Sequence, residues 1–149
     1  MSFIARLIAT GFYTGYAPKA PGTAGSLFGL FLYWAIPESK SVYSLVGIAL
    51  IFFTGVWAAN QVEKETKVHD NQIIVIDEIV GMLITVALFE KTLIWLVVGF
   101  LLFRFFDIIK PFPANSSEKI PHGWGVMMDD VVAGIYSALC LRLIYYFLN

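Results

Sequence analysis

Long apolar runs separated by short polar turns limit this chain to very few folds. Runs close to the roughly 20 residues that cross a lipid bilayer cover residues 42–59, 73–89, 93–109 and 131–148. A shorter run covers 26–37 and extends back toward Gly22, and residues 3–16 are interpreted as a helix at the membrane interface. Because 58% of the 149 residues are hydrophobic and only 14% are charged, a soluble domain of this size could not bury so much apolar surface. The sequence therefore predicts an all-α integral membrane helical bundle, a single domain over residues 1–149 with about five embedded segments, one of them short or re-entrant.

The polar turns indicate which ends of these segments lie together. They fall at residues 38–41, 60–72, 90–92 and 110–125. If the chain passes back and forth, loop 60–72, the end of 93–109 and the start of 131–148 meet at one end of the bundle, called here the charged end. Its lysines are Lys19, Lys64, Lys67, Lys110 and Lys119, whereas Lys40 and Lys91 lie at the opposite end. Because positive residues favour cytoplasmic loops, we expect the charged end to face the cytoplasm.

Two acidic pairs interrupt the apolar runs at this end. Asp77 and Glu78 lie inside the run 73–89, and Asp129 and Asp130 precede the last run. Small residues, Gly81 and Gly134, follow the pairs and would let the two helices approach closely. Four carboxylates brought together would repel one another, and an all-oxygen ligand set suits Mg²⁺. The pairs therefore predict a magnesium site, in which Asp77 and Asp130 are also expected to be catalytic. Helix capping is the alternative for Asp129 and Asp130.

The stretch RFFDIIKPFP, residues 104–113, adds two cations to the same end. Arg104, Asp107 and Lys110 are spaced along one broad helical face. Arg104 and Lys110 are candidates for binding a phosphate group, and Asp107 is a candidate further metal ligand. The alternative is a helix end held by salt bridges.

Two further stretches supply polar candidates. PGTAGS, residues 21–26, could bring backbone N–H groups close to an anion, with Thr23 and Ser26 contacting substrate. An ordinary turn capped by Thr23 or Ser26 is the alternative. His69 and His122, which precede the acidic pairs, are candidates for proton transfer, although a loop histidine is as often simply polar.

Four of these stretches together resemble the phosphatidylglycerophosphatase A family of bacterial membrane lipid phosphatases. They are PGTAGS at 21–26, VHDNQIIVIDEIVGM at 68–82, FRFFDIIKPFP at 103–113 and HGWGVMMDDVVAG at 122–134. The resemblance implies Mg²⁺-dependent removal of the terminal phosphate of phosphatidylglycerophosphate to give phosphatidylglycerol, at the bacterial cytoplasmic membrane. It carries a functional role to Asp77, Glu78, Asp107, Lys110, Asp129 and Asp130.

Other functions fit parts of the pattern. Acidic pairs in membrane helices are also typical of cation-coupled transporters, although transporter sites tend to lie near the bilayer midplane. A structural assembly factor with charges that pair its helices is a third alternative. A net charge of −1 argues against nucleic acid as a partner. The expected partners are a phospholipid substrate and the membrane, and the sequence leaves homo-oligomerisation open.

Overall fold

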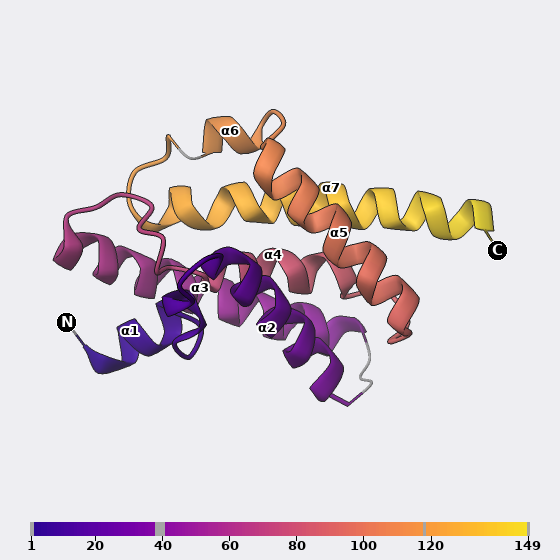
Figure 1. The fold of residues 1–149 in the computed structure, drawn as a ribbon, viewed down its shortest axis with the longest axis horizontal. Coiled ribbons are helices and arrows are strands. Elements are labelled where there is room, and N and C mark those ends of the chain that lie inside the picture. Colours follow the sequence, from indigo (N-terminus) through magenta and orange to yellow (C-terminus); the bar gives the residue numbers. More distant parts are fainter. Residues whose placement is uncertain (1, 38–40, 118, 149) are drawn as a thin grey trace.

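The computed structural model describes residues 2–37, 41–117 and 119–148. All the regular secondary structure in these ranges is helical (Figure 1), which confirms the all-α class. The elements are α1 (Phe3–Ala9), η1 (Thr14–Tyr16), α2 (Pro21–Ala35), α3 (Ser41–Thr66), α4 (Ile76–Val86), α5 (Leu93–Ile109), α6 (Ala114–Ser117) and α7 (Gly123–Leu148).

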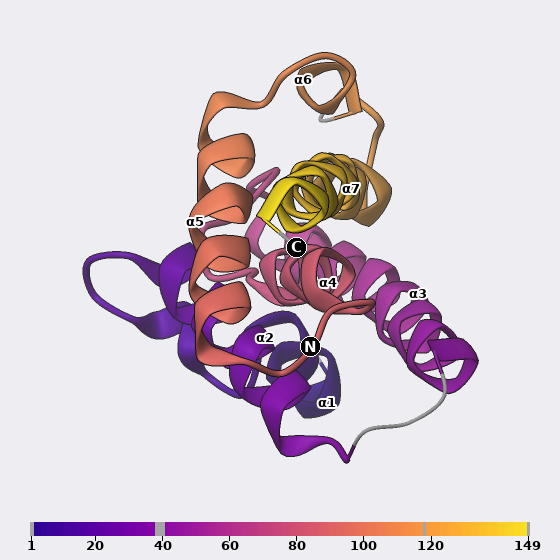
Figure 2. The same ribbon diagram turned by 90° about the vertical axis from the view of Figure 1, so that its right-hand side faces the viewer.

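Helix α4 forms the centre of the bundle. In the end-on view of Figure 2 it lies beneath α7, with α5, α2 and α3 around them, and it contacts all four of these helices. Nine of its 11 residues are buried. A largely apolar helix is buried when neighbouring helices surround it, and four helices do so here.

Helices α4 and α7 contact each other backbone to backbone at Gly81 and Gly134. A Cβ atom on Gly134 would lie 2.6 Å from the Gly81 carbonyl oxygen, and one on Gly81 would lie 2.8 Å from the Asp130 carbonyl oxygen. The buried Thr85 hydroxyl, 2.9 Å from Gly81 O and 3.4 Å from Gly134 O, lies across the same contact. The predicted close approach of these two helices is therefore confirmed.

The predicted number of embedded segments is not confirmed. Within the part of the chain that the structure describes, two helices are long and apolar enough to cross a membrane, over Val42–Thr66 and Gly123–Leu148. Helices α5, α2 and α4 have 17, 15 and 11 residues, or about 26, 23 and 17 Å, against a hydrocarbon core of about 30 Å.

The helix boundaries follow the apolar runs unevenly. Helix α5 covers the predicted 93–109, whereas α4 is shorter than the run 73–89. Helices α3 and α7 extend beyond their runs, so α3 takes in residues 60–66 of loop 60–72 and α7 takes in residues 123–125 of turn 110–125. The short helix α6 lies within that turn. The predicted interfacial helix at 3–16 divides into α1 and η1. The turn predicted at 38–41 and Lys40 within it lie largely outside the described residues.

Candidate active site

A polar cavity of about 400 Å³ opens at the charged end of the bundle. Its walls come from the first turns of α2 and α4, the last turns of α5, an inner part of α7 and the segment between α3 and α4. Acidic residues outnumber basic ones in its lining: Asp70, Asp77, Glu78, Asp107, Asp129 and Asp130 against Lys19, Arg104 and Lys110.

Three carboxylates converge in the buried part of this cavity. Asp77, Glu78 and Asp130 each offer one oxygen atom within 4.8 Å of the oxygens offered by the other two. Asp77 and Glu78 occupy the first turn of α4, and Asp130 comes from α7. Asp77 and Asp130 are only 7% and 2% exposed. The first turn of α4 and the glycine contact with α7 therefore set the spacing of this trio.

Each carboxylate of the trio has one oxygen atom that no group among the described residues satisfies. Asp77 Oδ1, Glu78 Oε2 and Asp130 Oδ2 are buried and have no hydrogen-bond partner there. Burying an ionised carboxylate without a partner is very costly. A hard divalent cation would offset this cost, and oxygen-only donors are the set that Mg²⁺ prefers. The residues present therefore fit a magnesium ion.

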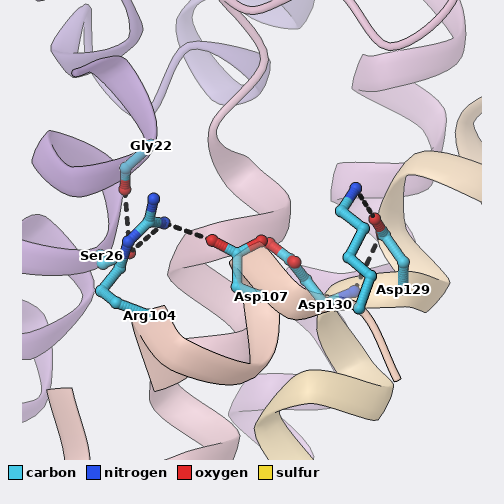
Figure 3. A network of polar contacts seen from close by, with 7 residues as sticks. Gly22, Ser26, Arg104, Asp107, Asp129 and Asp130 are labelled. Atoms are coloured by element: carbon cyan, nitrogen blue, oxygen red, sulfur yellow. Dashed lines mark hydrogen bonds and ion pairs between the residues drawn. The ribbon is translucent and has the colours of Figure 1, made fainter. Parts of the chain in front are cut away.

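Asp107 and Asp129, the other two predicted metal ligands, form ion pairs with cationic side chains. Arg104 Nη1 lies 2.5 Å from Asp107 Oδ2, and Lys110 Nζ lies 2.8 Å from Asp129 Oδ2. Figure 3 shows Asp107 and Asp129 on either side of Asp130, with the Asp107 carboxylate pointing toward it. Salt bridges thus form at the end of α5, as one alternative for RFFDIIKPFP expected, and they bring both phosphate-binding candidates to the edge of the carboxylate trio.

Helix α7 begins at Gly123, eight residues earlier than its apolar run. Asp129 and Asp130 therefore lie about two turns inside the helix. The helix-capping alternative for this pair is wrong. Instead, Asp129 Oδ1 accepts a hydrogen bond from the backbone N–H of Asp130 at 3.0 Å while its Oδ2 contacts Lys110.

The PGTAGS stretch forms the first turns of α2 rather than a separate turn. Pro21 occupies the first helical turn and the N-cap is Ala20, so neither Thr23 nor Ser26 is the cap. Thr23 lines the cavity, whereas Ser26 is fully buried. The Ser26 hydroxyl donates to Gly22 O at 2.8 Å and lies 3.4 Å from Arg104 Nη1 (Figure 3). Ser26 therefore contacts Arg104, and Thr23 faces the cavity.

Neither predicted histidine is among the cavity-lining residues. His69 Nδ1 lies 2.7 Å from Glu63 Oε1 at the end of α3. His122 adopts a left-handed backbone (φ 66°) just before α7, and its carbonyl accepts from Gly125 N at 3.0 Å. Their role in proton transfer stays a prediction.

Comparison with known proteins assigns the chain to a family. The sequence model of phosphatidylglycerophosphatase A matches residues 7–145, nearly the whole chain. The chain belongs to the phosphatidylglycerophosphatase A family. The resemblance expected from the four sequence stretches is thus confirmed.

Relatives of this chain carry two names. Proteins named phosphatidylglycerophosphatase A from Haemophilus influenzae and Escherichia coli are 39% and 41% identical, over 95% and 93% of this chain and 89% and 81% of theirs. A Bacteroides thetaiotaomicron protein named "Putative phosphatidylinositol-3-phosphatase" is 38% identical over 95% of this chain and 94% of its own. No solved structure matches the chain significantly.

Sequence reasoning missed several residues of the cavity. Asp70, Gln72 and Lys19 line it, and the buried Glu63 contacts the segment that carries Asp70. Asp70 and Gln72 stand directly after His69 in the same polar stretch, and Lys19 stands just before PGTAGS. The signal that could have identified these residues was their position next to a recognised motif. Their convergence depends on how the segment between α3 and α4 folds.

Proposed function

We propose that this protein hydrolyses the terminal phosphomonoester of phosphatidylglycerophosphate, releasing phosphate and phosphatidylglycerol in phospholipid biosynthesis. The observation that carries the proposal is the convergence of Asp77, Glu78 and Asp130, each with a buried oxygen that has no hydrogen-bond partner, beside two protein cations in a chain of this family. A metal-dependent phosphatase needs a metal-binding carboxylate cluster next to groups that can grip a phosphate.

Asp77, Glu78 and Asp130 would hold Mg²⁺. When bound, the ion supplies charge neutralisation for the phosphoryl group. Asp107 and Asp129 keep Arg104 and Lys110 at the edge of the trio in the free protein. These two cations bind phosphate oxygens when the lipid enters, Arg104 through paired N–H groups and Lys110 as a point charge.

The phosphate and the acyl chains have separate places in this arrangement. Polar groups line the cavity, whereas large apolar side chains are exposed along the outer faces of α3, α5 and α7, for example Phe53, Leu101 and Leu139. Such faces suit lipid, and the head group reaches the cavity while the acyl chains stay in the bilayer. In the proposed orientation, a multi-pass protein of the bacterial cytoplasmic membrane presents the lysine-rich charged end to the cytoplasm.

The head group follows from the same chemistry. The names of the relatives specify a glycerol or an inositol head group. Both are polyols that carry a phosphomonoester and are linked to diacylglycerol through a phosphodiester. We assign the glycerol lipid because the two relatives that share the family's name are named for that lipid.

The test is phosphate release from phosphatidylglycerophosphate by the purified chain in detergent micelles, with Mg²⁺ or with EDTA. We expect release with Mg²⁺, none with EDTA, and recovery when Mg²⁺ is restored. Asp77→Asn, checked for folding by its thermal unfolding curve, should be inactive in the same assay. Cation-coupled solute uptake into proteoliposomes without lipid hydrolysis would replace the proposal with the transporter alternative.

A further inference from the structure

A buried carboxylate outside the trio has no role in the chemistry proposed above. Glu63, near the end of α3, is 9% exposed, and its neighbour Val62 is fully buried. Its Oε1 accepts from His69 Nδ1 at 2.7 Å and from the backbone N–H of Asp70 at 3.0 Å. Because a buried carboxylate is retained only with good partners, this contact fixes the segment that carries His69 and Asp70.

The backbone of that segment is unusual. Lys67 and Asp70 both adopt left-handed conformations, with φ of 56° and 51°, which few residues other than glycine adopt. Lys67 N closes the end of α3 on Glu63 O at 2.8 Å. Glu63 therefore holds both ends of a tight turn, with its carbonyl at Lys67 and its carboxylate at Asp70. This turn brings Asp70 to the cavity wall.

Asp70 differs from the other carboxylates of the cavity. Asp77, Asp129 and Asp130 are buried, whereas Asp70 is exposed, so it lies toward the opening. Asp107 and Asp129 hold cations, while no ion pair within residues 2–37, 41–117 and 119–148 involves Asp70. An unpaired carboxylate at the opening repels a phosphate and accepts hydrogen bonds from hydroxyl groups.

We propose that Asp70 is a specificity-determining residue that binds the free hydroxyl of the substrate's polyol head group, and that Glu63 is the positioning residue that presents it. The inference rests on the proposed function. The terminal phosphate enters the deep part of the cavity, beside Arg104 and Lys110. The glycerol that follows it then lies toward the opening, within reach of Asp70.

The experiment compares phosphatidylglycerophosphate with its deoxy analogue, in which propane-1,3-diol replaces glycerol. The two lipids differ only in the hydroxyl. Removing one partner of a charge-assisted hydrogen bond costs about 10-fold in kcat/KM. We therefore expect the wild-type chain to prefer the hydroxylated lipid about 10-fold, mainly through KM. Asp70→Ala should lose this preference by acting more slowly on the hydroxylated lipid and equally well on the analogue.

Variants of Glu63 separate positioning from a general structural role. Glu63→Ala should also reduce the preference, Glu63→Gln should restore it because an amide oxygen still accepts both hydrogen bonds, and Glu63→Ala with Asp70→Ala should add no further loss. Glu65→Gln, two residues along α3 at the site of the Arg6 ion pair, is the matched control and should retain the wild-type preference.

Two results overturn the inference while leaving the proposed function intact. One is hydrolysis of both lipids at equal rates by the wild-type chain, and the other is an unchanged preference in Asp70→Ala. If the wild-type chain releases phosphate from neither lipid, the proposed function fails and this inference fails with it.

Discussion

The two acidic pairs look alike in the sequence and act differently in the structure. Asp77 and Glu78, in the first turn of α4, both contribute to the carboxylate trio. Asp130 joins them, but Asp129 turns to Lys110. Adjacent residues on a helix are about 100° apart, so Asp129 and Asp130 can point to different partners. Adjacency in the sequence therefore does not decide which carboxylates share a site.

The largest effects should follow from neutralising members of the trio. Asp77→Asn or Asp130→Asn should lower kcat by at least about 100-fold, because removing a metal ligand costs more than removing a group that supports one. Thermal unfolding supplies a second measurement, since Mg²⁺ should raise the Tm of the wild-type chain and not that of the variants. Asp129→Asn is the matched comparison, and equal damage there would remove the distinction between the two aspartates.

Separating the two helices should have the next largest effect. Gly134→Ala places a Cβ atom 2.6 Å from the Gly81 carbonyl oxygen, and such overpacking costs about 2 kcal/mol in the free energy of unfolding. Chemical denaturation in detergent measures this cost. Gly47→Ala on α3 is the control, because no heavy atom lies within 4 Å of its new Cβ. Equal stability of the two variants would contradict backbone contact between α4 and α7.

The Asp129–Lys110 pair should have a moderate effect. Lys110→Met should raise KM about 10-fold by removing a charged contact to the phosphate. Asp129→Asn with Lys110→Met should lose less than the sum of the single losses, because the residues are in direct contact. Michaelis–Menten kinetics of all three variants measure the coupling, and strict additivity would show that the pair does not act as a unit.

The smallest effect should come from Ser26. Its hydroxyl lies 3.4 Å from Arg104 Nη1, a long hydrogen bond between partly buried groups. Ser26→Ala should therefore lower kcat/KM about threefold, the value of a weak hydrogen bond, with Thr23→Val as the comparison at the cavity wall. A loss in Ser26→Ala as large as in Lys110→Met would mean that Ser26 contacts the substrate directly.

The fold was predictable where apolar composition and helix ends coincide. Helix α5 begins after the polar EKT and ends at Ile109, where the left-handed Lys110 precedes Pro111. Helix α3 was predicted too short because polar helix formers such as Gln61, Glu63 and Lys64 continue it past the apolar run. Helix α7 was predicted too short because it begins at Gly123, before its apolar run, and takes in Asp129 and Asp130.

Helix α4 exposes the limit of hydropathy. Its sequence was interpreted as a lipid-crossing segment, yet the residues before it form a turn, in which Ile74 N donates to Asn71 O at 2.8 Å, and Val75 N then donates to Ala9 O at 2.9 Å. A helix buried among other helices and a helix that faces lipid can have the same apolar sequence. Only contacts with distant helices separate the two cases.

The sequence predicted which types of residue form the site and at which end of the bundle they lie. Spacing along the chain indicated that the carboxylates and cations share one end, because successive helices reverse direction. It could not show that Asp107 and Asp129 pair with cations, since those contacts depend on side-chain direction. The role of Glu63 depends on a turn with two left-handed residues, Lys67 and Asp70, which no periodicity predicts.

The central position of α4 has a consequence for how the protein is made. At about 17 Å it is too short to cross the hydrocarbon core alone, so it depends on α7, which is synthesised after it. Until α7 has been synthesised, Gly134 cannot pack against Gly81, and Asp77 and Glu78 lack Asp130, the third carboxylate of the trio. We therefore expect a nascent chain halted before α7 to lack the complete trio.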